Sequence, residues 1–145
     1  MRRFAFRLEK LLEYRSFYER RAELVLAEKS GRCALLENRL AEIAQSRARA
    51  GRDMFAPGRD LADFRASELY IIRLDHERDK LLKELVLAQA EREKARLEYL
   101  DKHRDREVID KLKERREKEY YHLAQLEEIK TLDDIGRRSL VETGR

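Results

Sequence analysis

The chain has 145 residues, the length of one ordinary domain, but 44% of them are charged and the mean hydropathy is −0.81, which excludes a thick globular core. Glu, Lys, Arg, Leu and Ala dominate and Pro occurs once, a composition typical of long helices and coiled coils. The 34 basic and 30 acidic residues nearly cancel to a net charge of +4, which disfavours nucleic-acid binding by the chain as a whole.

The sequence also argues against secretion and against a membrane span. Cys33 is the only cysteine, so an intrachain disulfide is impossible, and it suits a small apolar position on a helix. No apolar run approaches the roughly 18 residues of a membrane span, and "MRRFAFRLEK" lacks the apolar centre of a secretion signal. We therefore expect a cytoplasmic protein that is at most peripheral to a membrane.

A first helix is predicted over residues 2–50, where no Pro occurs and apolar residues recur three and four apart. The apolar stripe consists of Leu8, Leu11, Leu12, Tyr18, Ala22, Val25, Leu26, Cys33, Leu36, Leu40 and Ile43. Charged slots near Arg15 and Lys29 interrupt it, and such interruptions often fix the register of a coiled coil. With 12 Lys or Arg against 7 Asp or Glu, residues 1–50 are mildly basic.

A turn is predicted over residues 51–58, "GRDMFAPG", which contain the only Pro and two of the five Gly. Pro57 disfavours helix at the preceding residue and removes a backbone donor. Asp60 can cap the next helix, and Asp53 is a second candidate. We expect Met54 and Phe55 to cover the end of the helix pair.

A second helix is predicted over residues 59–141, with a frayed C-terminus over 142–145. Its apolar stripe first runs through Leu61, Phe64, Ile71, Leu74, Leu81, Leu85, Ala88, Ala95 and Tyr99. After a shift in phase it continues through Val108, Leu112, Leu123, Leu126 and Ile129. Shifts of this kind resemble the stutters of coiled coils.

Two long helices joined by a short turn pack most economically as an antiparallel αα-hairpin. The expected fold class is all-α: a single domain, residues 1–145, formed by a long antiparallel two-helix coiled-coil hairpin with the second helix overhanging the first. At 1.5 Å per residue the helices would be about 75 Å and about 120 Å long. Counting outward from the turn places Phe4 beside Arg106 and leaves roughly 30 residues of the second helix unpaired.

No catalytic, cofactor or metal site is predicted. "DHERDK", residues 75–80, resembles the metalloprotease motif HExxH but has Lys80 in place of the second ligand. His76, His103 and His122 are too far apart on one helix to meet, and Gly51 and Gly58 are not followed by the Lys of a phosphate-binding loop. A helix pair also has little volume for a water-excluding pocket.

The more informative features are on the expected surface. Tyr120 and Tyr121 fall in the predicted overhang, where aromatic side chains without a partner indicate either a binding face or shielding by neighbouring Lys and Glu stems. Tyr70 should be exposed in the middle of the hairpin. The overhang has apolar residues at a spacing that a helix-binding groove would recognise: Leu112, Leu123, Leu126, Ile129, Leu132 and Ile135.

The sequence resembles the FliJ family, the small coiled-coil component of the bacterial flagellar type III export apparatus. The resemblance begins in "FAFRLEKLLEYRSFYERRAE", with Phe4, Phe6, Leu8, Leu11, Leu12, Arg15, Glu19 and Ala22. It continues through the Gly/Pro turn to "IKTLDDIGRR", with Lys130, Leu132, Asp133, Asp134 and Arg138. Gly136 departs from the helix-forming residue expected at its position.

The resemblance implies a non-enzymatic, stalk-like protein without cofactors. Its implied partners are the hexameric flagellar export ATPase, the cytoplasmic domain of the membrane export gate, and export chaperones, with no nucleic acid. It would be a monomer when free and would lie at the cytoplasmic face of the cell membrane, at the flagellar base. Residues expected at the ATPase ring are Tyr120, Tyr121, Leu126, Ile129, Leu132, Asp133, Asp134 and Arg138; Tyr70 and Leu74 are expected near the gate.

Two other functions remain open from the residues alone. A self-associating scaffold would use the apolar stripe of the overhang as a seam between copies. A nucleic-acid-binding protein would use the basic N-terminal arm, and its binding would fall steeply with salt.

Overall fold

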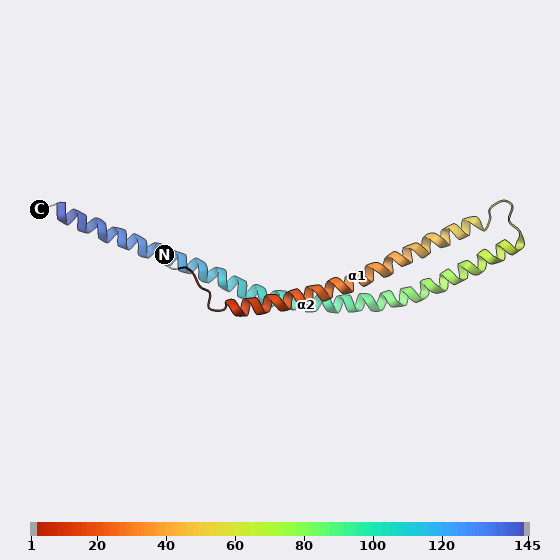
Figure 1. Cartoon of the computed structure of the whole chain (residues 1–145), viewed down its shortest axis with the longest axis horizontal. Helices are drawn as coiled ribbons and strands as arrows, with labels where there is room; N and C mark the ends of the chain where they lie inside the picture. The colour runs from red at the N-terminus through yellow and green to blue at the C-terminus, as the bar shows by residue number, and fades with distance from the viewer. Residues whose placement is uncertain (1–2, 144–145) are drawn as a thin grey trace. The chain divides into compact units, whose positions relative to one another are not determined.

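The computed structural model describes residues 3–143, with side chains as far as Arg138, and contains two helices. Helix α1 spans Glu9–Asp53 and α2 spans Leu61–Thr143 (Figure 1). The helices pack against each other, and the described residues contain no strand. The predicted fold class, all-α with two long packed helices, is confirmed.

The beginning of α1 differs from the prediction, because residues 3–6 are not helical. The Glu9 N–H donates to the Phe6 carbonyl over 3.2 Å, and the Leu12 N–H donates to the Leu8 carbonyl over 3.0 Å. Glu9 therefore lies in the first turn of α1, where a carboxylate is favoured by the positive end of the helix dipole. The helix predicted from residue 2 starts at Glu9. Residues 3–6, called the N-terminal strap below, precede it without helical structure.

The turn between the helices confirms Asp60 as the capping residue. The Asp63 N–H donates to Asp60 Oδ1 over 2.8 Å, which satisfies one of the free amides of the first turn of α2. Gly58 has φ of +85°, a conformation that strains any residue with a Cβ. Phe55 remains 79% exposed and contacts Phe64 with ring centroids 6.2 Å apart, so it covers the end of the helix pair less than expected.

The chain divides into two compact units, and the single domain expected from the sequence stays a prediction. The hairpin unit is Arg20–Leu100 and includes the turn. The terminal unit combines Met1–Glu19 with Asp101–Arg145. The end of α2 extends to Thr143, so residues 142–143 are helical, while residues 144–145 of the predicted frayed end lie outside the described residues.

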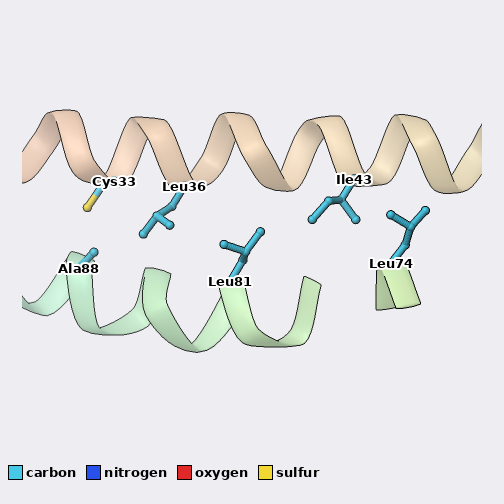
Figure 2. Packing of buried hydrophobic residues seen from close by; sticks show 6 residues of the cluster. All are labelled: Cys33, Leu36, Ile43, Leu74, Leu81 and Ala88. Carbon is cyan, nitrogen blue, oxygen red and sulfur yellow. The ribbon is translucent and has the colours of Figure 1, made fainter. Parts of the chain in front are cut away.

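In the hairpin unit, α1 and α2 run side by side in opposite directions around one apolar core (Figures 1 and 2). The buried residues are Cys33, Leu36 and Ile43 of α1 with Leu74, Leu81 and Ala88 of α2. Their spacing of three or seven residues keeps each set on one face of its helix, as in a coiled-coil seam. Cys33 is fully buried opposite the small Ala88, as Figure 2 shows, which confirms its structural interpretation.

Ion pairs flank this core and hold its register. The Lys29 ammonium lies 3.0 Å from Glu91, Arg39 lies 3.0 Å from Glu77, and Arg47 lies 2.7 Å from Asp75. The hydrogen bond from Arg47 lowers the pKa of Asp75 and is the largest influence on it. Burial acts in the opposite direction, but the pKa stays below its ordinary value. Since both partners of each pair are partly exposed, we expect each to specify register more than stability.

In the terminal unit the predicted shift of phase does not occur. Ile109 is buried at 8% exposure, whereas Val108, placed on the stripe by the sequence analysis, is 64% exposed. Ile109 continues the seven-residue spacing of Leu74, Leu81, Ala88 and Ala95, with Lys102 at the intervening position. The polar residue at that position concealed the continuous spacing in the sequence.

The register of the terminal unit also differs from the prediction. Glu19, and not Phe4, lies opposite Arg106, with which it forms an ion pair. Phe4 instead contacts Tyr120, with ring centroids 5.6 Å apart. The difference is already present within the helices, because Glu9 in the first turn of α1 pairs with Lys113 of α2. The unpaired part of α2 is correspondingly shorter than roughly 30 residues.

Candidate partner-binding surfaces

The overhang, defined here as residues 124–138, carries the apolar side chains that the sequence assigned to a partner. Leu126, Ile129, Leu132 and Ile135 are between 42% and 67% exposed, and Leu123 just before them is 60% exposed. Asp133, Asp134 and Arg138 are exposed as well. The overhang therefore keeps a large apolar surface in contact with water.

The apolar residues of the overhang do not form a single stripe. From Leu123 to Ile135 they recur at every third residue. Three residues rotate about 300° around an α-helix, so each apolar side chain lies about 60° from the previous one. Over the four steps the apolar path winds through about 240° of the helix circumference. The overhang is thus apolar on several sides, unlike the seam of the hairpin unit.

Tyr120 and Tyr121, which the sequence placed within the overhang, lie just before it. Tyr120 is half-buried against Phe4, and Tyr121 is 43% exposed with its ring at 5.6 Å from that of Tyr120. The expectation that both lack an intrachain partner is wrong for Tyr120. The N-terminal strap and α2 form a groove of about 700 Å³ around this contact, with Phe6, Leu112 and Leu123 among its walls.

Tyr70 and Leu74, grouped by the sequence as gate residues, differ in accessibility. Tyr70 is 42% exposed and borders a groove of about 400 Å³ beside the turn, together with Arg49 and Arg59. Leu74 is only 6% exposed and belongs to the core between the helices. Tyr70 can therefore meet a partner from this surface, whereas Leu74 supports the packing beneath it.

The sequence analysis missed a cluster of charged side chains within the seam of the terminal unit. Glu19 is 13% exposed; its carboxylate lies 2.6 Å from His103 Nδ1 and accepts a hydrogen bond from Arg106. Arg106 also donates to Asp110 over 2.7 Å. Charged residues at seam spacing in both helices were the available signal, but the sequence alone could not pair them.

Burial is the largest single influence on the pKa of Glu19 and acts to raise it. The hydrogen bonds and charges of His103 and Arg106 together outweigh that burial and leave the pKa below the ordinary glutamate value. The same contact, with the Glu19 hydrogen bond as the largest cause, raises the pKa of Arg106. The carboxylate is therefore ionised at neutral pH and holds the two helices together by charge-assisted hydrogen bonds.

The side chains described in the structure place no group of three or more His, Cys, Asp and Glu where a metal ion could be held. Within the described part of the chain, neither helix has a stretch apolar and long enough to cross a bilayer. The features that the structure does present are exposed apolar and aromatic surfaces on helices, which suit protein or interfacial contacts.

A family model described as flagellar FliJ protein matches residues 4–144. No curated protein and no solved structure matches the chain.

Proposed function

Because the chain belongs to the flagellar FliJ family, it is a component of the bacterial flagellar protein-export apparatus, and we propose that its overhang docks inside the ring of the export ATPase. The family is a non-enzymatic part of that apparatus. The proposal thus concerns a binding function, with the ATPase supplying the chemistry.

The winding apolar path of the overhang is the observation that supports ring docking. A helix with apolar side chains on several sides loses the most apolar surface to a partner that surrounds it. The central opening of a hexameric ring surrounds a helix in this way. Asp133, Asp134 and Arg138 add both signs of charge to the same segment, which can select the orientation of the helix within the ring.

The same path disfavours self-association through the overhang. A two-stranded coiled coil needs apolar residues alternately three and four apart, so that they stay on the side facing the partner. Steps of three residues rotate Leu132 and Ile135 away from the side occupied by Leu123. A second copy would cover only part of the path, and we therefore expect a monomer in the absence of the ATPase.

We assign the contact with the membrane export gate to the exposed surface around Tyr70, near the groove bordered by Arg49 and Arg59. Asp53 and Asp63 line the same groove, and an aromatic side chain beside charged groups of both signs suits a polar interface with an aromatic anchor. This contact would hold the protein at the cytoplasmic face of the membrane. Export chaperones complete the set of proposed partners, without residues assigned to them.

The test of ring docking is a triple variant, Leu126→Ser, Ile129→Ser and Leu132→Ser, in the full chain. A matched control replaces three exposed leucines of the hairpin unit: Leu24→Ser, Leu35→Ser and Leu69→Ser, which are between 65% and 71% exposed. We expect the overhang variant to lose at least about tenfold in affinity for the purified ATPase hexamer, since three exposed side chains give up burial of about 1 kcal/mol or more each. Pull-down and sedimentation measure the binding, and circular dichroism checks that the helices persist.

Binding of the overhang variant as tight as that of the control would refute ring docking. A stable dimer of the unmodified chain across micromolar dilution, abolished by the same triple substitution, would favour the self-associating scaffold instead. A truncation after Leu123 provides a second test, because it removes the overhang and keeps the contact between Phe4 and Tyr120.

A further inference from the structure

The N-terminal strap covers a part of α2 that α1 does not reach. Glu9, in the first turn of α1, pairs with Lys113 at 2.8 Å and lies at the end of the packing of helix on helix. Past this pair the ring of Phe4 lies 5.6 Å from that of Tyr120, and both side chains are partly buried. Eleven residues, close to three helical turns, separate Tyr120 from the buried Ile109, so the strap covers the continuation of the seam face.

The strap is held less firmly than α1. The Phe6 carbonyl accepts a hydrogen bond from the Glu9 N–H, a bond within the N-terminal segment that does not tie the strap to α2. Leu8 is 37% exposed, and the groove of about 700 Å³ is lined by the strap on one side and by α2 on the other. A contact with these features opens at a much lower free energy than a packed seam.

The residue beneath the strap belongs to the apolar path of the overhang. Tyr120 lies three residues before Leu123, and Leu126 follows after three more, so Tyr120 is one step before the exposed part of the path. Leu123 lines the groove and is 60% exposed. The path therefore continues from a covered first position to exposed later positions, and the cover ends where the overhang begins.

We propose that the partner-binding surface of α2 begins at Tyr120 and that the N-terminal strap is a displaceable cover on it. A ring that closely encloses the overhang reaches Tyr120 only when Phe4 lifts away, because the strap and the ring wall would occupy the same side of the helix. The displacing partner is the ring of the proposed function, on which this inference rests. The closed strap weakens the apparent affinity of the ring, since the ring gains Tyr120 only in chains whose strap is open.

An enclosing partner is the kind that can displace the strap. A partner shifts such an equilibrium only if it binds the open form more tightly than the closed form. A ring meets this condition because it buries Tyr120 together with the apolar side chains that follow it. Phe4 covers Tyr120 but leaves Leu123 largely in water. A partner that binds one side of the overhang would leave the strap in place.

The first test is a double-mutant cycle at Phe4 and Tyr120, measured as the affinity of the full chain for the purified ATPase hexamer. Phe4→Ser removes the cover and should raise the affinity about threefold to tenfold, the scale of releasing one partly buried ring. In a Tyr120→Ser chain the same substitution should change the affinity by less than about twofold, because the covered residue is absent. The matched control, Phe17→Ser, removes a 60% exposed ring of the same unit and should leave the affinity unchanged.

The second test holds the strap closed with Tyr120 in place. Phe4→Cys is combined with Arg116→Cys, which lines the same groove, and with Cys33→Ala. A flexible bismaleimide with a cleavable disulfide in its linker then joins the two new thiols. We expect the linked chain to bind the hexamer at least about threefold more weakly than the same chain after reduction. Circular dichroism checks that both forms keep their helices.

Three outcomes would each overturn the inference: equal affinity of Phe4→Ser and the unmodified chain, a rise that persists in the Tyr120→Ser chain, or no gain on cleaving the linker. These outcomes leave ring docking in place, because docking is tested by loss of binding in the triple variant of Leu126, Ile129 and Leu132. If that variant binds as tightly as its control, docking fails and the inference fails with it.

Discussion

At the scale of the residue, the seam of the terminal unit depends on charge where the seam of the hairpin unit depends on apolar contact. Glu19 loses hydration on burial and recovers stabilisation from His103 and Arg106. Arg15, noted in the sequence as an interruption, donates to the backbone carbonyl of Asp105 over 3.0 Å. The charged side chains at these positions each bind a particular partner on the other helix. An apolar side chain would not select its partner in this way.

We predict that Glu19→Gln lowers the free energy of unfolding at pH 7 by about 1–3 kcal/mol, because Arg106 keeps Asp110 but loses its ionised partner on the other helix. Since folding lowers the pKa of Glu19, its contribution is complete above the ordinary glutamate pKa and is lost as the pH falls through the folded-state value. Urea unfolding at pH 7 and pH 3 measures both effects. The difference between unmodified chain and variant should shrink at pH 3.

The control for this prediction is Glu13→Gln, an exposed residue of the same helix that should change stability little. If the two substitutions have equal effects at pH 7, or if the effect of Glu19→Gln is the same at both pH values, the carboxylate does not hold the helices as described.

At the scale of the element, the buried residues of α2 follow a single seven-residue spacing along the sequence, in the hairpin unit and in the terminal unit. Leu74, Leu81, Ala88 and Ala95 begin it, and Ile109 continues it after a polar position. Beyond Leu123 the spacing changes to steps of three, where no other described segment covers the helix side chains. The change in spacing therefore marks the end of intrachain packing and the start of the overhang.

This continuity predicts different costs for two adjacent substitutions. Ile109→Ala should destabilise the chain by about 2–3 kcal/mol, because it removes buried methyl groups from the seam. Val108→Ala should change stability by less than about 0.5 kcal/mol, since its side chain is mostly in water. Thermal or urea unfolding of both variants measures the comparison, and a larger effect at Val108 would restore the phase shift expected from the sequence.

At the scale of the whole molecule, the described residues differ widely in how much tertiary contact supports their helices. The hairpin unit contains the cluster of buried residues around Leu36 and Leu81. The overhang has helical backbone with exposed side chains, and long exposed helices depend on propensity and local pairs alone. Opening of the overhang should therefore need much less free energy than opening of the hairpin core.

Amide hydrogen exchange measures this difference. We expect residues 124–138 to exchange at least about 100-fold faster than the amides around Leu36 and Leu81, because local opening of the overhang disrupts no core. Addition of the export ATPase hexamer should protect the overhang selectively. Strong protection of the overhang in the free chain would instead indicate a second copy already covering it, and no added protection with the ATPase would count against docking.

Much of the fold could be predicted because its signals are local. The spacing of Cys33, Leu36 and Ile43, the turn at Pro57 and the cap at Asp60 each depend on residues near one another in the chain. Part of the candidate surface was predictable for the same reason, since exposed apolar residues in the overhang follow from the length difference of the helices. The different exposure of Tyr70 and Leu74 also followed from the sequence, because Leu74 lies on the apolar stripe and Tyr70 was expected to be exposed; only the family resemblance grouped both as gate residues.

The sequence by itself determined two long helices, a turn near Pro57 and an apolar segment near the C-terminus without an equal partner, because propensity and periodicity act over a few residues. Only the tertiary structure decided the register, the burial of Ile109 in place of Val108, the contact of Phe4 with Tyr120 and the pairing of Glu19 with Arg106. These depend on which residues of two distant segments meet, and that choice rests on the summed packing and electrostatics of the assembled helices.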